Sequence, residues 1–153
     1  MRVFLQVLAL LAMSVALASC SKEPQAIPYG SANCVHCNMT VADNRFGAEL
    51  VNDKGKPYFF DSSECLMAYV NEHAAEGDKA AHLLVTDYTQ TPTLINAQEA
   101  LFLQSKAIAS PMGMHLVAIK SKAVAAQMQQ EQDGRILTWN QALEAVQKNE
   151  RPE

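Results

Sequence analysis

The chain has 153 residues with a formal net charge of −4, and 49% of its residues are hydrophobic. This length and composition fit a single globular domain with a core of its own. The slight excess of acidic residues argues against a nucleic-acid-binding protein, since such proteins usually present a basic surface.

Residues 1–19 have the features of a secretory signal peptide. Arg2 is their only charged residue, and an apolar run from residue 7 to residue 18 follows it. This run is shorter than the ~20 residues that a membrane-spanning helix needs, whereas a positive start and a short apolar core are typical of a signal peptide. Leu17-Ala18-Ser19-Cys20 resembles the bacterial lipobox, which predicts lipidation of Cys20. An ordinary signal peptide that is cleaved nearby is the alternative.

Residues 20–30 contain two prolines and several polar residues. We expect them to form a short tether between the lipid and a single domain over residues 31–150. Ser21, rather than Asp, follows the cysteine, which favours the outer membrane in Gram-negative sorting. The sequence therefore predicts a membrane-anchored lipoprotein that faces the periplasm.

The first half of the domain predicts a β-β-α-β unit. Two strands form a hairpin around a turn that contains Gly55. Asp61 is the expected cap of the helix, with Glu64 as its capping-box partner, and the helix is expected to end near Gly77. The expected strands span residues 46–51, 58–60 and 82–86.

The second half shows a similar order. Ser121 is expected to cap a helix that runs through Gln132 and stops at Gly134. The segment 97–103 is ambiguous between helix and strand. The expected strands span residues 93–95, 115–120 and 135–138, and a last helix spans about 140–148. Together the halves predict an α+β fold of two ββαβ units packed side by side.

Three cysteines remain beyond Cys20, namely Cys34, Cys37 and Cys65. An odd number of thiols excludes a fully paired disulfide scaffold. Free thiols oxidise readily outside the cytoplasm, so the presence of three suggests that they act as thiolates. Cys34 and Cys37 form a C-x-x-C pair in the stretch CVHCNM, and Met39 follows two residues later.

Three interpretations of this stretch compete. A thioredoxin-like redox pair normally begins a helix within a βαβ pattern, whereas this pair precedes a hairpin. Structural zinc needs four nitrogen or sulfur ligands, which the three cysteines and a histidine could supply, although a second C-x-x-C pair is missing. Cu(I) prefers thiolate and thioether ligands. Met39 favours this third interpretation, because it lies on the same face of an extended segment as Cys37.

Further soft ligands lie far along the chain, where Met112 and Met114 precede His115 in a loop with Pro and Gly. Methionine often fills gaps in a core, and the loop position leaves packing and metal binding both open. Met67 and Met128 instead lie on expected apolar helix faces, so we interpret them as core residues.

Several segments together resemble the NosL family of nitrous-oxide reductase accessory lipoproteins. Cys37-Asn38-Met39-Thr40 is similar to the cysteine-x-methionine signature of that family. The other similar segments are Phe59-Phe60-Asp61 leading to Cys65, Val85-Thr86-Asp87-Tyr88, Ile95 to Ala100, Ser110-Pro111-Met112-Gly113, and Gly134 to Thr138. The resemblance covers most of the chain beyond the signal peptide, and the order and spacing of the segments make it specific.

The resemblance implies a periplasm-facing lipoprotein that binds one Cu(I) and passes it toward the copper–sulfur centre of nitrous-oxide reductase. The implied partners are the reductase and a membrane ABC-type assembly complex with its periplasmic partner. The implied fold is partly similar to organomercurial lyase. Carried over residue by residue, the resemblance makes Cys37, Met39 and Met112 the first-choice Cu(I) ligands. Further candidate ligands are Cys34, Cys65, Met114, His115 and His36.

A second likeness concerns the hairpin. A C-x-x-C pair followed by a hairpin that ends in FFDSSEC resembles treble-clef-like modules of heavy-metal sensors, in which a cysteine at the helix start joins the site. Cys65 has that place here, so all three thiols would then surround one metal. The alternatives are a zinc-stabilised interaction domain of the envelope and a general heavy-metal scavenger. We do not expect an enzyme, because no Ser-His-Asp set, phosphate-binding Gly loop or carboxylate pair has a persuasive spacing.

Overall fold

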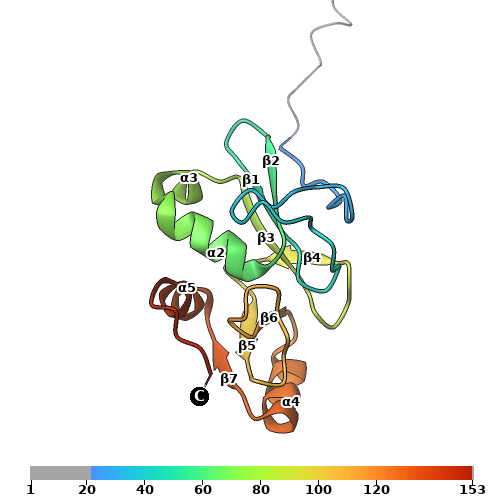
Figure 1. The fold of residues 1–153 in the computed structure, drawn as a ribbon, viewed down its shortest axis with the longest axis vertical. Helices are drawn as coiled ribbons and strands as arrows, with labels where there is room; N and C mark the ends of the chain where they lie inside the picture. The colour runs from blue at the N-terminus through green and yellow to red at the C-terminus, as the bar shows by residue number, and fades with distance from the viewer. Residues whose placement is uncertain (1–21, 153) are drawn as a thin grey trace, which may run out of the picture.

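The computed structural model describes residues 22–152, so the expected signal peptide and the lipidation site Cys20 lie outside the described residues. The described chain forms two antiparallel sheets with helices beside them, which confirms the expected α+β fold (Figure 1). In Figure 1 the four-stranded sheet occupies the upper part of the molecule and the three-stranded sheet the lower part.

The first unit is built around a four-stranded sheet. Its elements are β1 (Ala48–Val51), β2 (Pro57–Phe60), α2 (Ser63–Glu72), α3 (Ala74–Asp78), β3 (His82–Thr86) and β4 (Leu94–Asn96). β1 pairs with β2 on one side and with β3 on the other, and β4 pairs with β3, which gives the order β2-β1-β3-β4. The short strand that the sequence placed at the start of the second half therefore belongs to the first sheet.

The second unit has the strand order β6-β5-β7. Its elements are β5 (Leu101–Gln104), β6 (Leu116–Ile119), α4 (Lys122–Gln132), β7 (Arg135–Leu137) and α5 (Trp139–Gln147). The ambiguous segment before Gln104 thus ends as a strand. The backbone joins the two sheets where the amide of Tyr88 donates to the carbonyl of Ala118 at 2.9 Å.

Helix α2 begins one residue later than expected and ends earlier. Ser62, which has an extended backbone, is the N-cap, and its hydroxyl accepts from the amide of Cys65 at 3.3 Å. Asp61 is therefore not the cap, and Glu64 is not its capping-box partner. The helix ends at Glu72, and His73 separates it from the short helix α3, in which Gly77 lies.

The ends of α4 show one prediction confirmed and one refined. The hydroxyl of Ser121 accepts from the amide of Val124, as a cap should. The left-handed residue at the C-terminus is Asp133 (φ 47°) and not Gly134. Gly134 is needed for a different reason, since a Cβ atom there would lie 2.6 Å from the carbonyl oxygen of Gln104.

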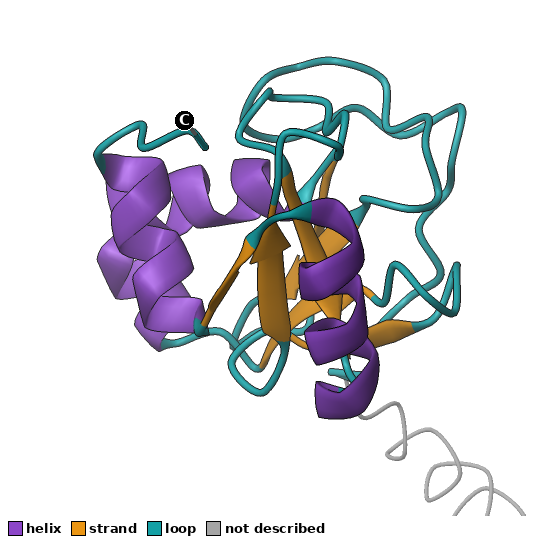
Figure 2. Cartoon of the chain, turned by 90° about the horizontal axis from the view of Figure 1, so that it is seen from below, coloured by secondary structure: helices purple, strands orange, loops and turns teal. Residues whose placement is uncertain are grey.

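One main core joins the two units. It contains Phe60, Leu66 and Val85 from the first unit and Phe102, Leu116 and Trp139 from the second. Helix α5 packs against α2 and completes this core. Seen from below, the helices lie to the left and in front of the strands, whereas long loops occupy the right-hand side (Figure 2). Between residues 22 and 152, no helix combines the length and the apolar character that crossing a membrane requires.

Candidate metal centre

Residues 34–39 form a tight turn that presents two cysteines. The amide of Cys34 donates to the carbonyl of Met39 at 2.8 Å, and the amide of Asn38 donates to the carbonyl of Cys34 at 2.9 Å. Asn38 takes the left-handed conformation (φ 61°), which asparagine tolerates better than most residues. The amide of Val35 donates to the carbonyl of Phe59, so the turn is fixed to the hairpin strand β2.

A third cysteine reaches the same place from the first turn of α2. The Sγ atoms of Cys34, Cys37 and Cys65 all lie within 4.8 Å of one another. A metal–sulfur bond of about 2.3 Å places the sulfurs of a trigonal or tetrahedral site about 3.8–4.0 Å apart. Shifts of less than about 1 Å would therefore bring all three sulfurs onto one ion. The three thiols are free, and Cys34 and Cys65 are buried, with 1% and 0% exposure.

The three thiols differ strongly in acidity. Hydrogen bonding to Cys65 and to the backbone amide of Cys37 lowers the pKa of Cys34 to about 5, although burial opposes this shift. The pKa of Cys65 is raised, first by the hydrogen bond with Cys34 and then by burial. Burial also raises the pKa of Cys37. The hydrogen bonds among the thiols therefore favour a thiolate within the cluster, which attracts a cation.

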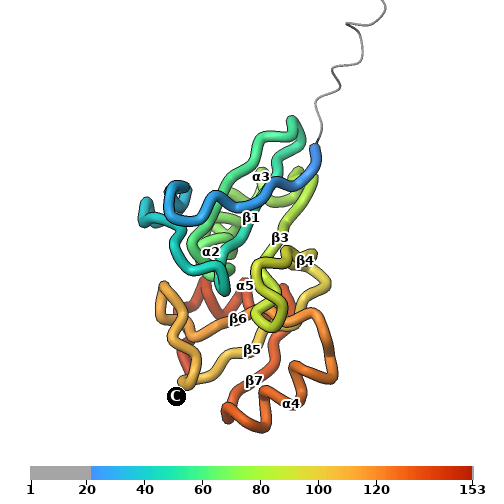
Figure 3. The backbone as a smooth tube through the Cα atoms, turned by 90° about the vertical axis from the view of Figure 1, so that its right-hand side faces the viewer, coloured from blue at the N-terminus to red at the C-terminus, as the bar shows by residue number. Residues whose placement is uncertain are grey.

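The loop between β5 and β6 brings two thioethers to a pocket that is also lined by Cys65 of this cluster. Met112 and Met114 line a small pocket of about 180 Å³ together with Cys65 and His36. The remaining lining residues are Glu64, Ala68, Val146, Asn149 and Arg151. In Figure 3 the N-terminal loops (blue) and this loop (orange) lie on the same side of the molecule. The pocket thus joins segments from both units.

A buried carboxylate holds this loop in place. Glu64 accepts hydrogen bonds from the hydroxyl of Ser110, from the amide of Met112 at 3.0 Å and from the amide of Leu116 at 3.2 Å. Burial raises the pKa of Glu64, and these donors partly offset the shift. The sequence alone did not indicate this role, because Glu64 fits the local spacing of a capping box.

The family model NosL matches residues 26–146. The chain belongs to the NosL family. No curated protein matches the sequence. Among solved structures, the crystal structure of the copper chaperone NosL from Shewanella denitrificans is similar, with a TM-score of 0.65 and 20% sequence identity over 78% of this chain and 95% of that one.

The first-choice ligands of this NosL-family chain have different surroundings. Cys37 lies in the thiol cluster and is partly exposed. Met112 lines the pocket that Cys65 shares. Met39 is 51% exposed, so its side chain extends into solvent from the turn. Cys34, which carried less weight than Cys37 in the sequence analysis, is buried inside the cluster.

The two histidine candidates of this NosL-family chain are also placed differently. His36 lines the pocket, and its Nδ1 lies 3.5 Å from a carboxylate oxygen of Glu72. His115 is not among the pocket residues. Its Nδ1 lies 2.6 Å from the carbonyl oxygen of Ile108. Because a carbonyl oxygen accepts, this ring nitrogen donates a hydrogen bond and is not free to bind a metal. The structure therefore brings His36, and not His115, to the sulfur ligands.

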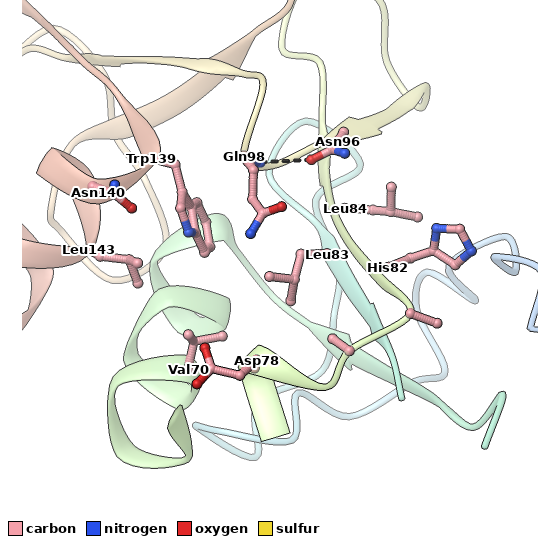
Figure 4. Close-up of a pocket in the computed structure, with 13 residues that line it drawn as sticks. Val70, Asp78, His82, Leu83, Leu84, Asn96, Gln98, Trp139, Asn140 and Leu143 are labelled. Carbon is pink, nitrogen blue, oxygen red and sulfur yellow. Dashed lines mark hydrogen bonds between the residues drawn. The ribbon is translucent and has the colours of Figure 1, made fainter. Parts of the chain in front are cut away.

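A separate pocket of about 390 Å³ lies between α2, β3 and α5 (Figure 4). His82 and Leu83 line one side of it, and Trp139 and Leu143 line another. No cysteine or methionine contributes to its lining. This pocket lacks the sulfur atoms that a soft metal prefers, so the thiol cluster remains the candidate metal centre of the described residues.

Proposed function

We propose that this NosL-family protein binds one Cu(I) ion and delivers it for assembly of the copper–sulfur centre of nitrous-oxide reductase. The observation that carries the proposal is a cluster of three thiols, one of which, Cys65, lines a small pocket together with Met112 and Met114. Thiolate and thioether sulfurs together select Cu(I) over harder cations. The solved structure of similar fold is that of a copper chaperone.

The arrangement suits a carrier that must also release its ion. Thiolates from Cys34, Cys37 and Cys65 would supply the affinity, and Met39 and Met112 would add neutral sulfur contacts. A Cu(I) ion held by three of these sulfurs at a time leaves room for an incoming ligand from a recipient protein. Met39 extends into solvent beside Cys37, where such a recipient could approach the ion.

The proposal includes where the protein works and with what. We infer a lipoprotein that is anchored through Cys20, faces the periplasm and lies at the outer membrane, as the lipobox-like sequence predicts. Its proposed partners are nitrous-oxide reductase and an ABC-type assembly complex with a periplasmic component. Labelling with a radioactive fatty acid, in the natural chain and in a Cys20→Ala variant, tests the anchor. An unlabelled natural chain would refute it.

Metal binding is tested on the full-length protein, purified reduced and without oxygen. Competition against a chromophoric Cu(I) chelator should give one Cu(I) per chain, and X-ray absorption at the copper edge should show a shell of sulfur atoms. Cys37→Ser should abolish binding, whereas Met112→Ala should weaken it. Unchanged binding by the Cys37→Ser variant would show that the ion lies elsewhere.

Delivery needs a separate test in cells. A strain that lacks this protein should produce nitrous-oxide reductase deficient in its copper–sulfur centre. The natural gene should restore the centre, and the gene with Cys37→Ser should not. A fully loaded reductase in the deletion strain would refute delivery and favour the general heavy-metal scavenger.

Zinc is the second candidate for the site, because His36 lines the same pocket as Cys65 and could complete a set of three thiolates and one imidazole. In that case the protein would be a zinc-stabilised interaction domain of the envelope. Elemental analysis after purification separates the two functions. Stoichiometric zinc that resists exchange by Cu(I) would favour the zinc domain and contradict copper delivery.

A further inference from the structure

Glu64 is a buried carboxylate whose hydrogen bonds all go to one distant segment, the loop that precedes β6 and the first residue of that strand. It is 2% exposed and lies in the first turn of α2, directly before Cys65. Its Oε1 accepts from the hydroxyl of Ser110 and the amide of Leu116, and its Oε2 accepts from the amide of Met112. Among the described residues it has no ion-pair partner. A carboxylate is costly to bury without a cation, so these three donors are what stabilise it there.

This set of hydrogen bonds connects the two kinds of sulfur ligand. Cys65 is covalently adjacent to Glu64 on the helix, and Met112 is one of the loop residues that Glu64 binds. Met112 and Met114 line the same pocket as Cys65. The position of the thioether loop relative to the thiol cluster therefore depends on the carboxylate of Glu64.

We propose that Glu64 is a positioning residue that makes the centre selective for Cu(I) over Zn(II). It holds the thioethers of Met112 and Met114 at the thiol cluster, where Cu(I) can use them. Zn(II) is bound by thiolate and imidazole and gains nothing from thioethers. Loss of Glu64 therefore weakens Cu(I) binding while the thiolate set for Zn(II) stays in place. This inference rests on the proposed function, because it presumes that Cu(I) is the ion carried.

Glutamine is the informative substitution, because it keeps the size of the side chain and removes one acceptor. Its amide offers a single oxygen and an NH₂ group. Whichever way the amide turns, the NH₂ group faces donors of the loop, namely the amide of Met112 or the groups of Ser110 and Leu116. At least one of the three hydrogen bonds is therefore replaced by a contact between two donors.

The test compares Glu64→Gln with Glu49→Gln in the full-length protein. Glu49 is also fully buried, but it lies in β1 and accepts from the amide of Gln25 at 2.9 Å, so it serves as a matched control. Cu(I) affinity is measured against bicinchoninate and Zn(II) affinity against a chromophoric zinc chelator. Glu64→Gln should lower the Cu(I) affinity about 10–100-fold, the range typical for groups that orient metal ligands. The Zn(II) affinity of that variant, and both affinities of Glu49→Gln, should stay unchanged.

Two further variants keep the result decisive. In a protein that already carries Met112→Ala and Met114→Ala, adding Glu64→Gln should change the Cu(I) affinity no further. If circular dichroism shows that Glu64→Gln does not fold, Ser110→Ala removes one donor and leaves the carboxylate, and should shift the selectivity in the same direction.

Equal losses of Cu(I) and Zn(II) affinity would show that Glu64 acts only on the fold, and unchanged Cu(I) affinity would show that it does not position the loop. Either result overturns this inference and leaves the proposed function standing. A natural protein that binds Zn(II) but no Cu(I) would overturn both.

Discussion

Replacing Cys65 by alanine separates a centre that uses all three thiols from one that does not need the thiol of helix α2. The helix should survive the change, because Ser62 caps it through the backbone amide of residue 65, which alanine retains. The lost hydrogen bond to Cys34 costs about 1 kcal/mol of unfolding free energy. The fold is therefore expected to remain intact, and the metal site is the part that changes.

The expected loss of Cu(I) affinity follows from the geometry of the cluster. The three Sγ atoms lie within 4.8 Å of one another, so Cys65 is already placed to bind and its loss removes a direct ligand. Removing a direct ligand should cost at least as much as the about 100-fold upper range for groups that only orient ligands. This corresponds to about 2.8 kcal/mol of binding free energy.

Anaerobic competition with a chromophoric Cu(I) chelator measures this affinity, and thermal unfolding monitors the fold. Met67→Leu is the matched control, since Met67 is fully buried on the same helix and conserving its volume costs less than about 1.5 kcal/mol. Natural affinity in Cys65→Ala would refute a three-thiol centre. The ligands would then lie among Cys34, Cys37, Met39 and Met112.

Three further expectations concern other parts of the chain. Met39→Ala should lower the Cu(I) affinity about tenfold and leave the unfolding free energy unchanged within about 0.5 kcal/mol, since the side chain is exposed; an unchanged affinity would remove Met39 from the ligand set. Cu(I) affinity should rise with pH from about 6 to about 8, because the raised pKa values of Cys37 and Cys65 mean that both thiols must lose protons to bind. A flat profile would contradict thiolate ligation. Gly134→Ala should destabilise the fold by about 1–3 kcal/mol in urea unfolding, because the new Cβ atom meets the carbonyl of Gln104; an unchanged midpoint would contradict that contact.

Local signals in the sequence were enough to predict most elements. The turn at Gly55 and the apolar runs beside it predicted the β1–β2 hairpin, and Ser121 predicted the start of α4. These features depend on residues close together in the chain. The pairing of β4 with β3 could not be predicted in the same way, because strand partners are chosen by packing across the whole sheet.

The candidate site was predictable only in part, because some of its contacts join residues that lie far apart in the chain. The C-x-x-C pair and the treble-clef-like likeness pointed to Cys65, and the structure places all three thiols together. Glu64 was misassigned, because its hydrogen-bond partners lie 46 or more residues away and a helix start offered a closer explanation. The identity of the bound ion and the full ligand set remain predictions.

The exposure of Met39 affects where oxidation of such a centre would begin. Cys34 and Cys65 are buried and Met114 is nearly so, whereas half of the Met39 side chain meets the solvent. A peroxide in solution would therefore reach this thioether before those sulfurs, and its sulfoxide is polar and a poorer soft ligand. We expect oxidative damage to begin at the outer edge of the centre, at Met39 and the partly exposed Cys37, and the sulfoxide of Met39 to be reversible by a methionine sulfoxide reductase. The buried thiols would remain intact beneath it.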